Sequence, residues 1–121
     1  MSNATSDYRI PRPDIRWRTP WSQIEDEEQQ QGIQAELQRE LSSAHSLWKT
    51  APVVFGKHQG NDDVLVALAD GRFAIVHLVW HGKVDQFPDK FPWTHICADL
   101  QAFQQELDSE ADDWRESEEP G

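Results

Sequence analysis

One stretch of the chain, residues 62–80, constrains the fold more than any other. Two apolar runs flank the pair Asp70-Gly71, and both runs are rich in β-branched residues. Asp-Gly tolerates the positive φ angles of a type I′ turn, so the pattern predicts a tight antiparallel hairpin. The rest of the chain is then expected to pack on this hairpin.

The predicted hairpin is apolar on both of its faces. A two-residue loop would pair Ala69 with Arg72, Leu68 with Phe73, Val66 with Ile75 and Val64 with His77. The alternate face would carry Leu65, Ala67, Ala74, Val76, Leu78 and Trp80. A sheet with one wet face alternates apolar with polar residues, so these strands are expected to be covered on both sides.

Helical patterns lie on either side of the hairpin. Ser22, with Glu25 three residues later, has the spacing of a capping box and predicts the start of a first helix. Its apolar positions are Ile33, Leu37, Leu41, Ala44 and Trp48. Its opposite face, with Glu36, Arg39 and Glu40, is expected to be solvated. Asp99 predicts the cap of a final helix, whose apolar positions are Leu100, Phe103, Leu107, Ala111 and Trp114.

The predicted fold is therefore α+β. It consists of an N-terminal helix, a three-stranded antiparallel β-meander with strands near 53–58, 63–69 and 72–80, an aromatic loop and a C-terminal helix. With 121 residues, the chain has the length of one domain, which we place at 22–114. Residues 115–121 read as an acidic tail.

Residues 1–21 form a separate, irregular arm in this interpretation. Three prolines resist regular structure, and four arginines make the arm the only basic stretch of the chain. In one reading the arm lies on the acidic body, with Trp17 or Trp21 held in a groove. In the other it binds a partner.

The charge balance limits the possible partners. The chain holds 22 Asp and Glu against 11 Lys and Arg, a formal net charge of −11. Phosphate binding draws on basic patches, so this charge argues against nucleic acids and anionic membranes and favours a basic protein partner. The single cysteine, together with the lack of a basic segment followed by an apolar one near the N-terminus, points to the cytoplasm.

Four side chains are of types that carry out chemistry in other proteins. His77, His81, His95 and Cys97 are of the types that bind zinc or form a nucleophile–base pair. Their spacing lacks the paired short motifs of structural zinc sites. We expect His77 to be a hydrogen-bonded core histidine and Cys97 a small buried hydrophobe, so no catalytic residue, metal or cofactor is predicted.

The segment after Trp80 is predicted to be an aromatic loop. Its rings are expected either to form a contact surface or to fold over the sheet as a lid. For the contact surface, rings and nearby carboxylates would anchor a partner, while carboxylates of the first helix would steer it. The candidate partner-binding residues are Asp85, Phe87, Asp89, Phe91, Trp93, Glu25, Glu28 and Glu36.

Residues 47–103 carry a resemblance to known proteins. Asp62-Asp63-Val64-Leu65, Asp70-Gly71-Arg72-Phe73-Ala74 and Val76-His77-Leu78-Val79-Trp80, followed by Pro92-Trp93, resemble a group of small bacterial proteins of uncharacterised function. The resemblance covers about half of the chain and implies a compact α+β unit with a recurring histidine and tryptophan on the last hairpin strand. It implies no activity.

A looser similarity, in charge and size, is to the immunity proteins and antitoxins that block basic nuclease toxins. It suggests a non-enzymatic inhibitor that caps a basic active site with carboxylates. Two alternatives remain open at this point. One is a small hydrolase or metal-dependent enzyme built on His77, His81, His95 and Cys97, and the other is a homodimeric structural or regulatory protein.

Overall fold

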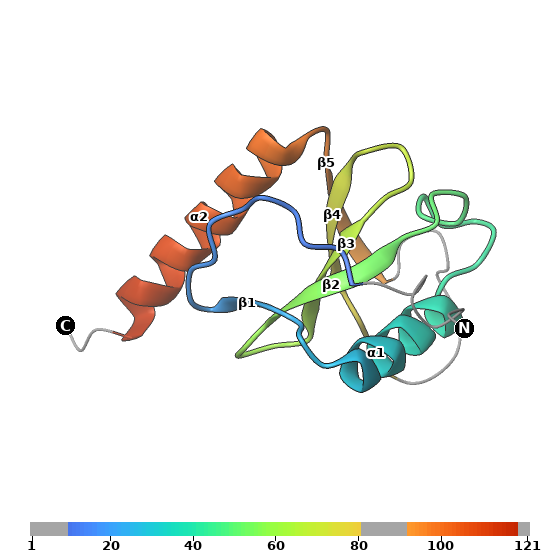
Figure 1. The fold of residues 1–121 in the computed structure, drawn as a ribbon, viewed down its shortest axis with the longest axis horizontal. Helices are drawn as coiled ribbons and strands as arrows, with labels where there is room; N and C mark the ends of the chain where they lie inside the picture. Colours follow the sequence, from blue (N-terminus) through green and yellow to red (C-terminus); the bar gives the residue numbers. More distant parts are fainter. Residues whose placement is uncertain (1–9, 81–91, 119–121) are drawn as a thin grey trace, which may run out of the picture.

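A computed structural model describes residues 10–80 and 92–118 of the chain. Its elements are β1 (Trp21–Gln23), α1 (Glu27–Glu40), β2 (Val53–His58), β3 (Asp63–Ala67), β4 (Phe73–His77), β5 (Trp93–Cys97) and α2 (Leu100–Glu118). The strands form one antiparallel sheet in the order β1-β2-β3-β4-β5 (Figure 1). The fold is α+β, as predicted, but the three-stranded meander is wrong because a further strand pairs at each edge.

The first additional strand replaces the predicted start of the first helix. Ser22 lies in β1 opposite Lys57, so its backbone serves strand pairing and cannot begin a helix. Helix α1 starts four residues later than a cap at Ser22 requires, where a side-chain oxygen of Asp26 accepts the N–H of Glu28 at 3.1 Å. A side-chain N-cap is therefore present, but the capping residue is Asp26 and not Ser22.

The end of α1 also differs from the prediction. The helix stops at Glu40, and Leu41 has extended backbone angles. The hydroxyl of Ser42 then accepts the N–H of Ala44 at 3.1 Å, a local bond that competes with helix continuation. Trp48, expected on the buried helical stripe, instead lies in a turn and is 49% exposed.

The central hairpin is confirmed, with a different loop. The N–H of Leu68 bonds to the carbonyl of Arg72, and Gly71 has a φ of +91°. These features define a three-residue loop ending in a left-handed glycine. The register therefore slips by one residue, which places Val66 opposite Ala74 and not opposite the predicted Ile75.

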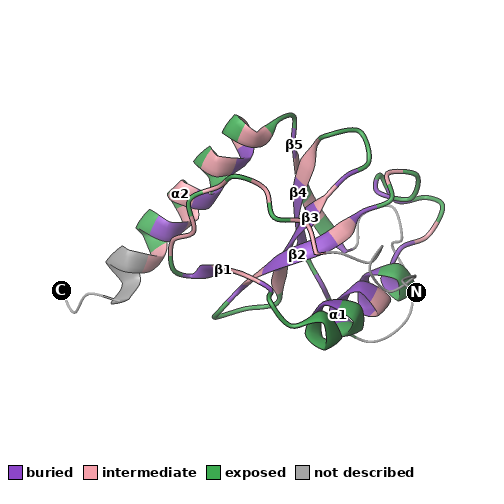
Figure 2. Cartoon of the chain, viewed as in Figure 1, coloured by how far each residue is buried: buried purple, intermediate pink, exposed green. Residues whose placement is uncertain are grey.

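The sheet is covered on both faces, as its apolar strands predicted. Val64, Val66, Ala74 and Val76 pack with Leu37 of α1 and further apolar residues in one cluster. Leu65, Phe55 and Ile75 pack with Phe103 and Leu107 of α2 in the other. Figure 2 shows the buried residues along the strands between the two helices. The two helices thus lie on opposite faces of the sheet.

Residues 10–20 contain no helix or strand, and the part from residue 14 to residue 18 lies along α2. Arg16 and Arg18 form ion pairs with Asp108 and Asp112 at 2.7 Å, and Trp17 packs edge-on against Phe55. This is the arrangement expected by the first reading of the arm, in which it rests on the acidic body. The β1 strand begins at Trp21, which is buried.

The final helix begins where predicted. The carboxylate of Asp99 accepts the N–H of Ala102 at 2.8 Å, just ahead of the first turn of α2. The backbone stays helical to Glu118, so the helix extends into the segment predicted as a tail. Neither helix in the described part of the chain is long and apolar enough to cross a membrane.

Candidate functional site

Helix α2 carries three stripes of different chemistry. Its apolar stripe of Phe103, Leu107 and Ala111 is buried against the sheet. A second stripe binds the segment 16–18: Gln104 exchanges hydrogen bonds with the backbone of Arg16, while Asp108 and Asp112 pair with arginines. The third stripe holds Glu106, Ser109 and Glu110, which face a cleft beside β5.

A row of aromatic and ionisable side chains crosses the sheet below this third stripe. Trp21 of β1 lies opposite His58 of β2, Asp63 of β3 opposite His77 of β4, and His77 opposite Trp93 of β5. Lys57 of β2 lies opposite Val64 of β3, and the same register one residue further along places His58 beside Asp63. Residues that face each other across strands point to the same side of a sheet. Five strands therefore contribute one side chain each to one surface.

Each histidine near this row has a carboxylate partner. The His77 ring nitrogen Nδ1 lies 2.7 Å from Asp63, His58 Nε2 lies 3.2 Å from Glu110, and His95 Nε2 lies 3.7 Å from Glu106. The Gly60 N–H donates to Nδ1 of His58 at 2.9 Å, so in the neutral ring Nε2 carries the proton and donates to Glu110.

The His58 ring also attaches α2 to the sheet. It lies edge-on between Trp21, 4.9 Å away, and Trp114 of α2, 5.1 Å away, measured between ring centroids. Aromatic pairs in this geometry add stability beyond their buried area. The cleft wall formed by α2 is thus held in place by packing and not only by charge.

The cleft enclosed by these groups has a volume of about 220 Å³. Its lining consists of Trp21, Asp63, Ile75, Trp93, His95, Glu106, Ser109 and Glu110. Imidazole carries charge only when protonated, so with neutral histidines three carboxylates leave the cleft negative. Carboxylates beside indole rings are the groups that bind an ammonium or guanidinium group.

The predicted partner-binding residues are scattered. Trp93 is 54% exposed and lines the cleft. Glu25 precedes α1 and pairs with Arg12, and Glu28 is exposed on α1, on the other side of the sheet. Asp85, Phe87, Asp89 and Phe91 lie outside the described residues, as does His81. The surface proposed from sequence therefore does not come together as one site within the part that is described.

Glu36, expected on a solvated helix face, is buried at 2% exposure. Glu40, one turn further along α1, is 1% exposed and accepts the backbone N–H groups of Val79 and Trp80 at 2.9 and 2.7 Å. Burial and a hydrogen bond with Glu36 raise the pKa of Glu40 to about 7. The prediction of a solvated face was wrong here because the segment after β4 supplies two N–H donors to the buried carboxylate of Glu40.

The histidine and cysteine candidates for enzymatic chemistry differ in how far they are buried. His77 is exposed at the end of β4, which corrects its prediction as a core histidine, although its hydrogen bond is present. Cys97 is buried, and burial, with smaller contributions from Glu106 and Asp99, raises the pKa of its thiol to about 11. A thiol with that pKa is protonated at neutral pH and is a poor nucleophile. In the described ranges, no three His, Cys, Asp or Glu residues are grouped so as to hold a metal ion.

Sequence reasoning missed most of the cleft residues. Asp63, Glu106 and Glu110 line the cleft, and His58 bonds to Glu110, but no local sequence motif links these four residues. The signal that could have linked two of them is the spacing of Glu106 and Glu110, which puts both on one helical face. The other two depend on strand register.

Comparisons of this chain with protein-family models, with curated proteins and with solved structures gave no match.

Proposed function

We propose that this chain is a non-enzymatic acidic binding domain that captures a basic protein, in the manner of immunity proteins and antitoxins, in a reducing cytoplasm. One observation carries the proposal: Asp63, Glu106 and Glu110 converge with Trp93 on a single cleft. A lysine or arginine side chain of the partner would place its cationic group among these carboxylates and its stem against the indole.

The chain already contains a smaller version of this interaction. Arg16 and Arg18 bind the second stripe of α2 through carboxylates of the same helix. The third stripe carries the same type of groups, with Glu106 exposed to solvent beside the cleft. A basic segment of a partner would therefore bind α2 on the side that the chain's own arginines leave open.

Electrostatics and packing are expected to act on different rate constants. The net charge of −11 attracts a basic partner over long range and raises the association rate, an effect that salt weakens. Trp93, which is half-exposed and lines the cleft, would become buried under the partner and set the dissociation rate, as buried aromatic anchors generally do.

Capture from native lysate at low and moderate salt, followed by mass spectrometry, tests the proposal. The bait is compared with Glu106→Gln/Glu110→Gln and with a matched control, Glu27→Gln/Glu28→Gln, which removes two exposed charges from α1. We expect one basic protein to be retained by the native chain and the control and lost from the cleft variant. That partner's activity should fall to zero at one equivalent of the chain.

Kinetics with the captured partner then separate the two roles. Trp93→Ala should speed dissociation about tenfold or more, while the cleft variant should slow association at low salt. No protein captured at either salt would refute the proposal, as would equal loss with both double variants. Turnover of a small-molecule panel would favour the enzyme alternative, and a concentration-dependent mass without any partner would favour the homodimer.

A further inference from the structure

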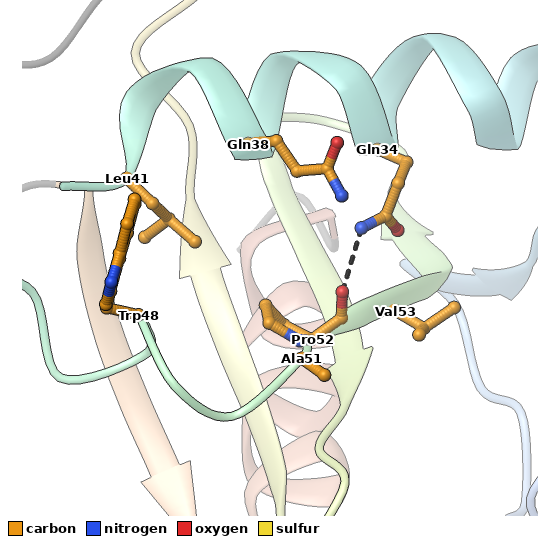
Figure 3. A pocket seen from close by; sticks show the side chains of 7 residues that line it. All are labelled: Gln34, Gln38, Leu41, Trp48, Ala51, Pro52 and Val53. Carbon is orange, nitrogen blue, oxygen red and sulfur yellow. Dashed lines mark hydrogen bonds between the residues drawn. The ribbon is translucent and has the colours of Figure 1, made fainter. Parts of the chain in front are cut away.

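A second pocket lies on the α1 side of the sheet, away from the acidic cleft. It has a volume of about 410 Å³ and is bounded by α1, by the turn that follows it and by the start of β2 (Figure 3). Its lining residues are Gln34, Gln38, Leu41, Trp48, Ala51, Pro52 and Val53. The volume is in the range of roughly 300 to 1,000 Å³ that is usual for small-molecule sites.

The wall formed by the turn is held in place by backbone hydrogen bonds. Trp48 donates its N–H to the carbonyl of His45 at 3.0 Å, and Thr50 donates to that of Leu47 at 3.1 Å. The carbonyl of Thr50 in turn accepts the N–H of Ala69 at 2.8 Å, which ties the turn to the loop between β3 and β4. The pocket is therefore formed before anything binds.

The opposite wall is fixed by the amide of Gln34. This buried side chain donates to the carbonyl of Pro52 and accepts the N–H of Val54, both at 2.8 Å. It thereby closes the part of the β2 edge that β1 does not reach. Both hydrogen-bonding ends of Gln34 are used in this way, so it serves as a structural wall.

Two side chains of the pocket, those of Trp48 and Gln38, form no hydrogen bond within the described part of the chain. The indole of Trp48 is 49% exposed and stands beside Leu41 in Figure 3. The amide of Gln38 projects from α1 into the space above Pro52, and it has no hydrogen-bond partner among the described residues. Ala51, at the rim, has a φ of +48°, a conformation that is costly for any residue with a Cβ atom.

We infer that this pocket binds a small, uncharged, planar molecule that carries a carboxamide-like edge. A flat ring would stack on the indole of Trp48 and fill the apolar space next to Leu41 and Pro52. Its donor and acceptor would pair with the two ends of the Gln38 amide, which offers the complementary acceptor and donor. None of the residues named as lining the pocket is charged, so an ion would lose its hydration without gaining a counter-charge.

Benzamide is the simplest probe with these properties, and two analogues test its parts. Benzoate keeps the ring but is anionic, and cyclohexanecarboxamide keeps the amide but is not planar. Titration is followed by ¹H–¹⁵N NMR of the full chain. We expect benzamide to shift the indole N–H of Trp48 and the side-chain NH₂ of Gln38, and both analogues to bind about tenfold more weakly.

Two variants locate the binding, and a third serves as a control. Gln38→Ala should weaken benzamide binding about tenfold, and Trp48→Ala should abolish it, while Trp93→Ala in the acidic cleft should leave it unchanged. Gln38 and Trp48 are both exposed, so neither variant is expected to disturb folding, which circular dichroism checks.

Several results would overturn the inference. These are equal binding of all three compounds, shifts that centre on Trp93, or no shift at millimolar probe. Loss of Trp48 exposure as protein concentration rises, abolished by Trp48→Ala, would show that the pocket is instead an interface between two copies of the chain.

Discussion

Replacing Glu40 by glutamine should make the protein more stable at slightly alkaline pH and remove a pH dependence. Glu40 is buried beside Glu36, whose other neighbour is the guanidinium of Arg39 at 2.8 Å. Two buried carboxylates in contact are more stable when they share a proton. Burial and the hydrogen bond with Glu36 therefore raise the pKa of Glu40. The N–H groups of Val79 and Trp80 act in the opposite direction, because they stabilise the ionised form.

The sign follows from proton binding in the two states. In the unfolded chain Glu40 has its ordinary pKa of 4.5, and in the folded chain a pKa of about 7. Between these values the folded state binds more protons than the unfolded state, so the free energy of unfolding falls as pH rises. The stabilisation from this group is complete below the lower value and lost above the higher one.

The size of the effect follows from the same two pKa values. At about 1.4 kcal/mol for each tenfold change in the proton equilibrium, the shift corresponds to roughly 3 kcal/mol. Glu40→Gln is neutral at every pH, and its amide can accept from Trp80 and donate to Glu36. Its NH₂ group cannot accept the N–H of Val79, which the second carboxylate oxygen of Glu40 accepts. The lost bond to Val79 costs about 1 kcal/mol, so the variant should be slightly less stable than the native chain near pH 5 and more stable by roughly 1 to 2 kcal/mol near pH 8.

Urea unfolding at about pH 5, 6, 7 and 8 measures this directly. The matched control is Glu28→Gln, which removes a carboxylate from an exposed position of the same helix and should follow the native curve. Parallel curves for the native chain and Glu40→Gln across this range would refute the reasoning. So would a variant that is less stable than the native chain at pH 8.

Two further predictions concern packing and reactivity. Gly56→Ala should destabilise the protein by about 1 to 3 kcal/mol, because the added Cβ would lie 2.9 Å from the ring of Trp17. Gly32→Ala lies in open space within α1 and should instead stabilise the protein by about 0.5 to 1 kcal/mol. Equal urea midpoints for the two variants would contradict the packing described. Cys97 should resist iodoacetamide at pH 8 in the native protein and react fully in guanidinium, as followed by intact mass, because burial keeps its thiol protonated; rapid alkylation of the native chain would show that it is accessible.

Local sequence signals determined the parts of this fold that depend on neighbouring residues. The Asp70-Gly71 turn lies between two apolar runs, and β2 spans the predicted residues 53–58. The cap at Asp99 gives the start of α2, and apolar residues on both sides of the hairpin predicted cover on both faces. In each case the determinant is hydrophobic periodicity or a short-range hydrogen bond, which adjacent residues encode.

Tertiary structure alone decided the edges of the sheet and the register within it. Residues 21–23 and 93–97 are strands because β2 and β4 offer them unpaired edges, and a short segment gains little from its own propensity. For residues 93–97, the β-branched Thr94 and Ile96 weakly indicate a strand after Pro92. For residues 21–23 there is no such indication, because Ser22 fits a helix cap as well as it fits a strand. The one-residue slip at Gly71 required the geometry of the whole loop.

The candidate sites depend on such long-range decisions almost entirely. His58, Asp63 and Trp93 lie in one row because three strand pairings align them, and no spacing along the chain encodes that alignment. Glu40 is buried because two N–H groups in the segment after β4 satisfy its carboxylate. The charge of Glu40, taken by itself, predicted that its side chain is exposed to solvent. The sequence determined which groups this protein has available, and the packing of distant segments decided which of them meet, because the cost of burying a charge depends on partners that only the folded chain supplies.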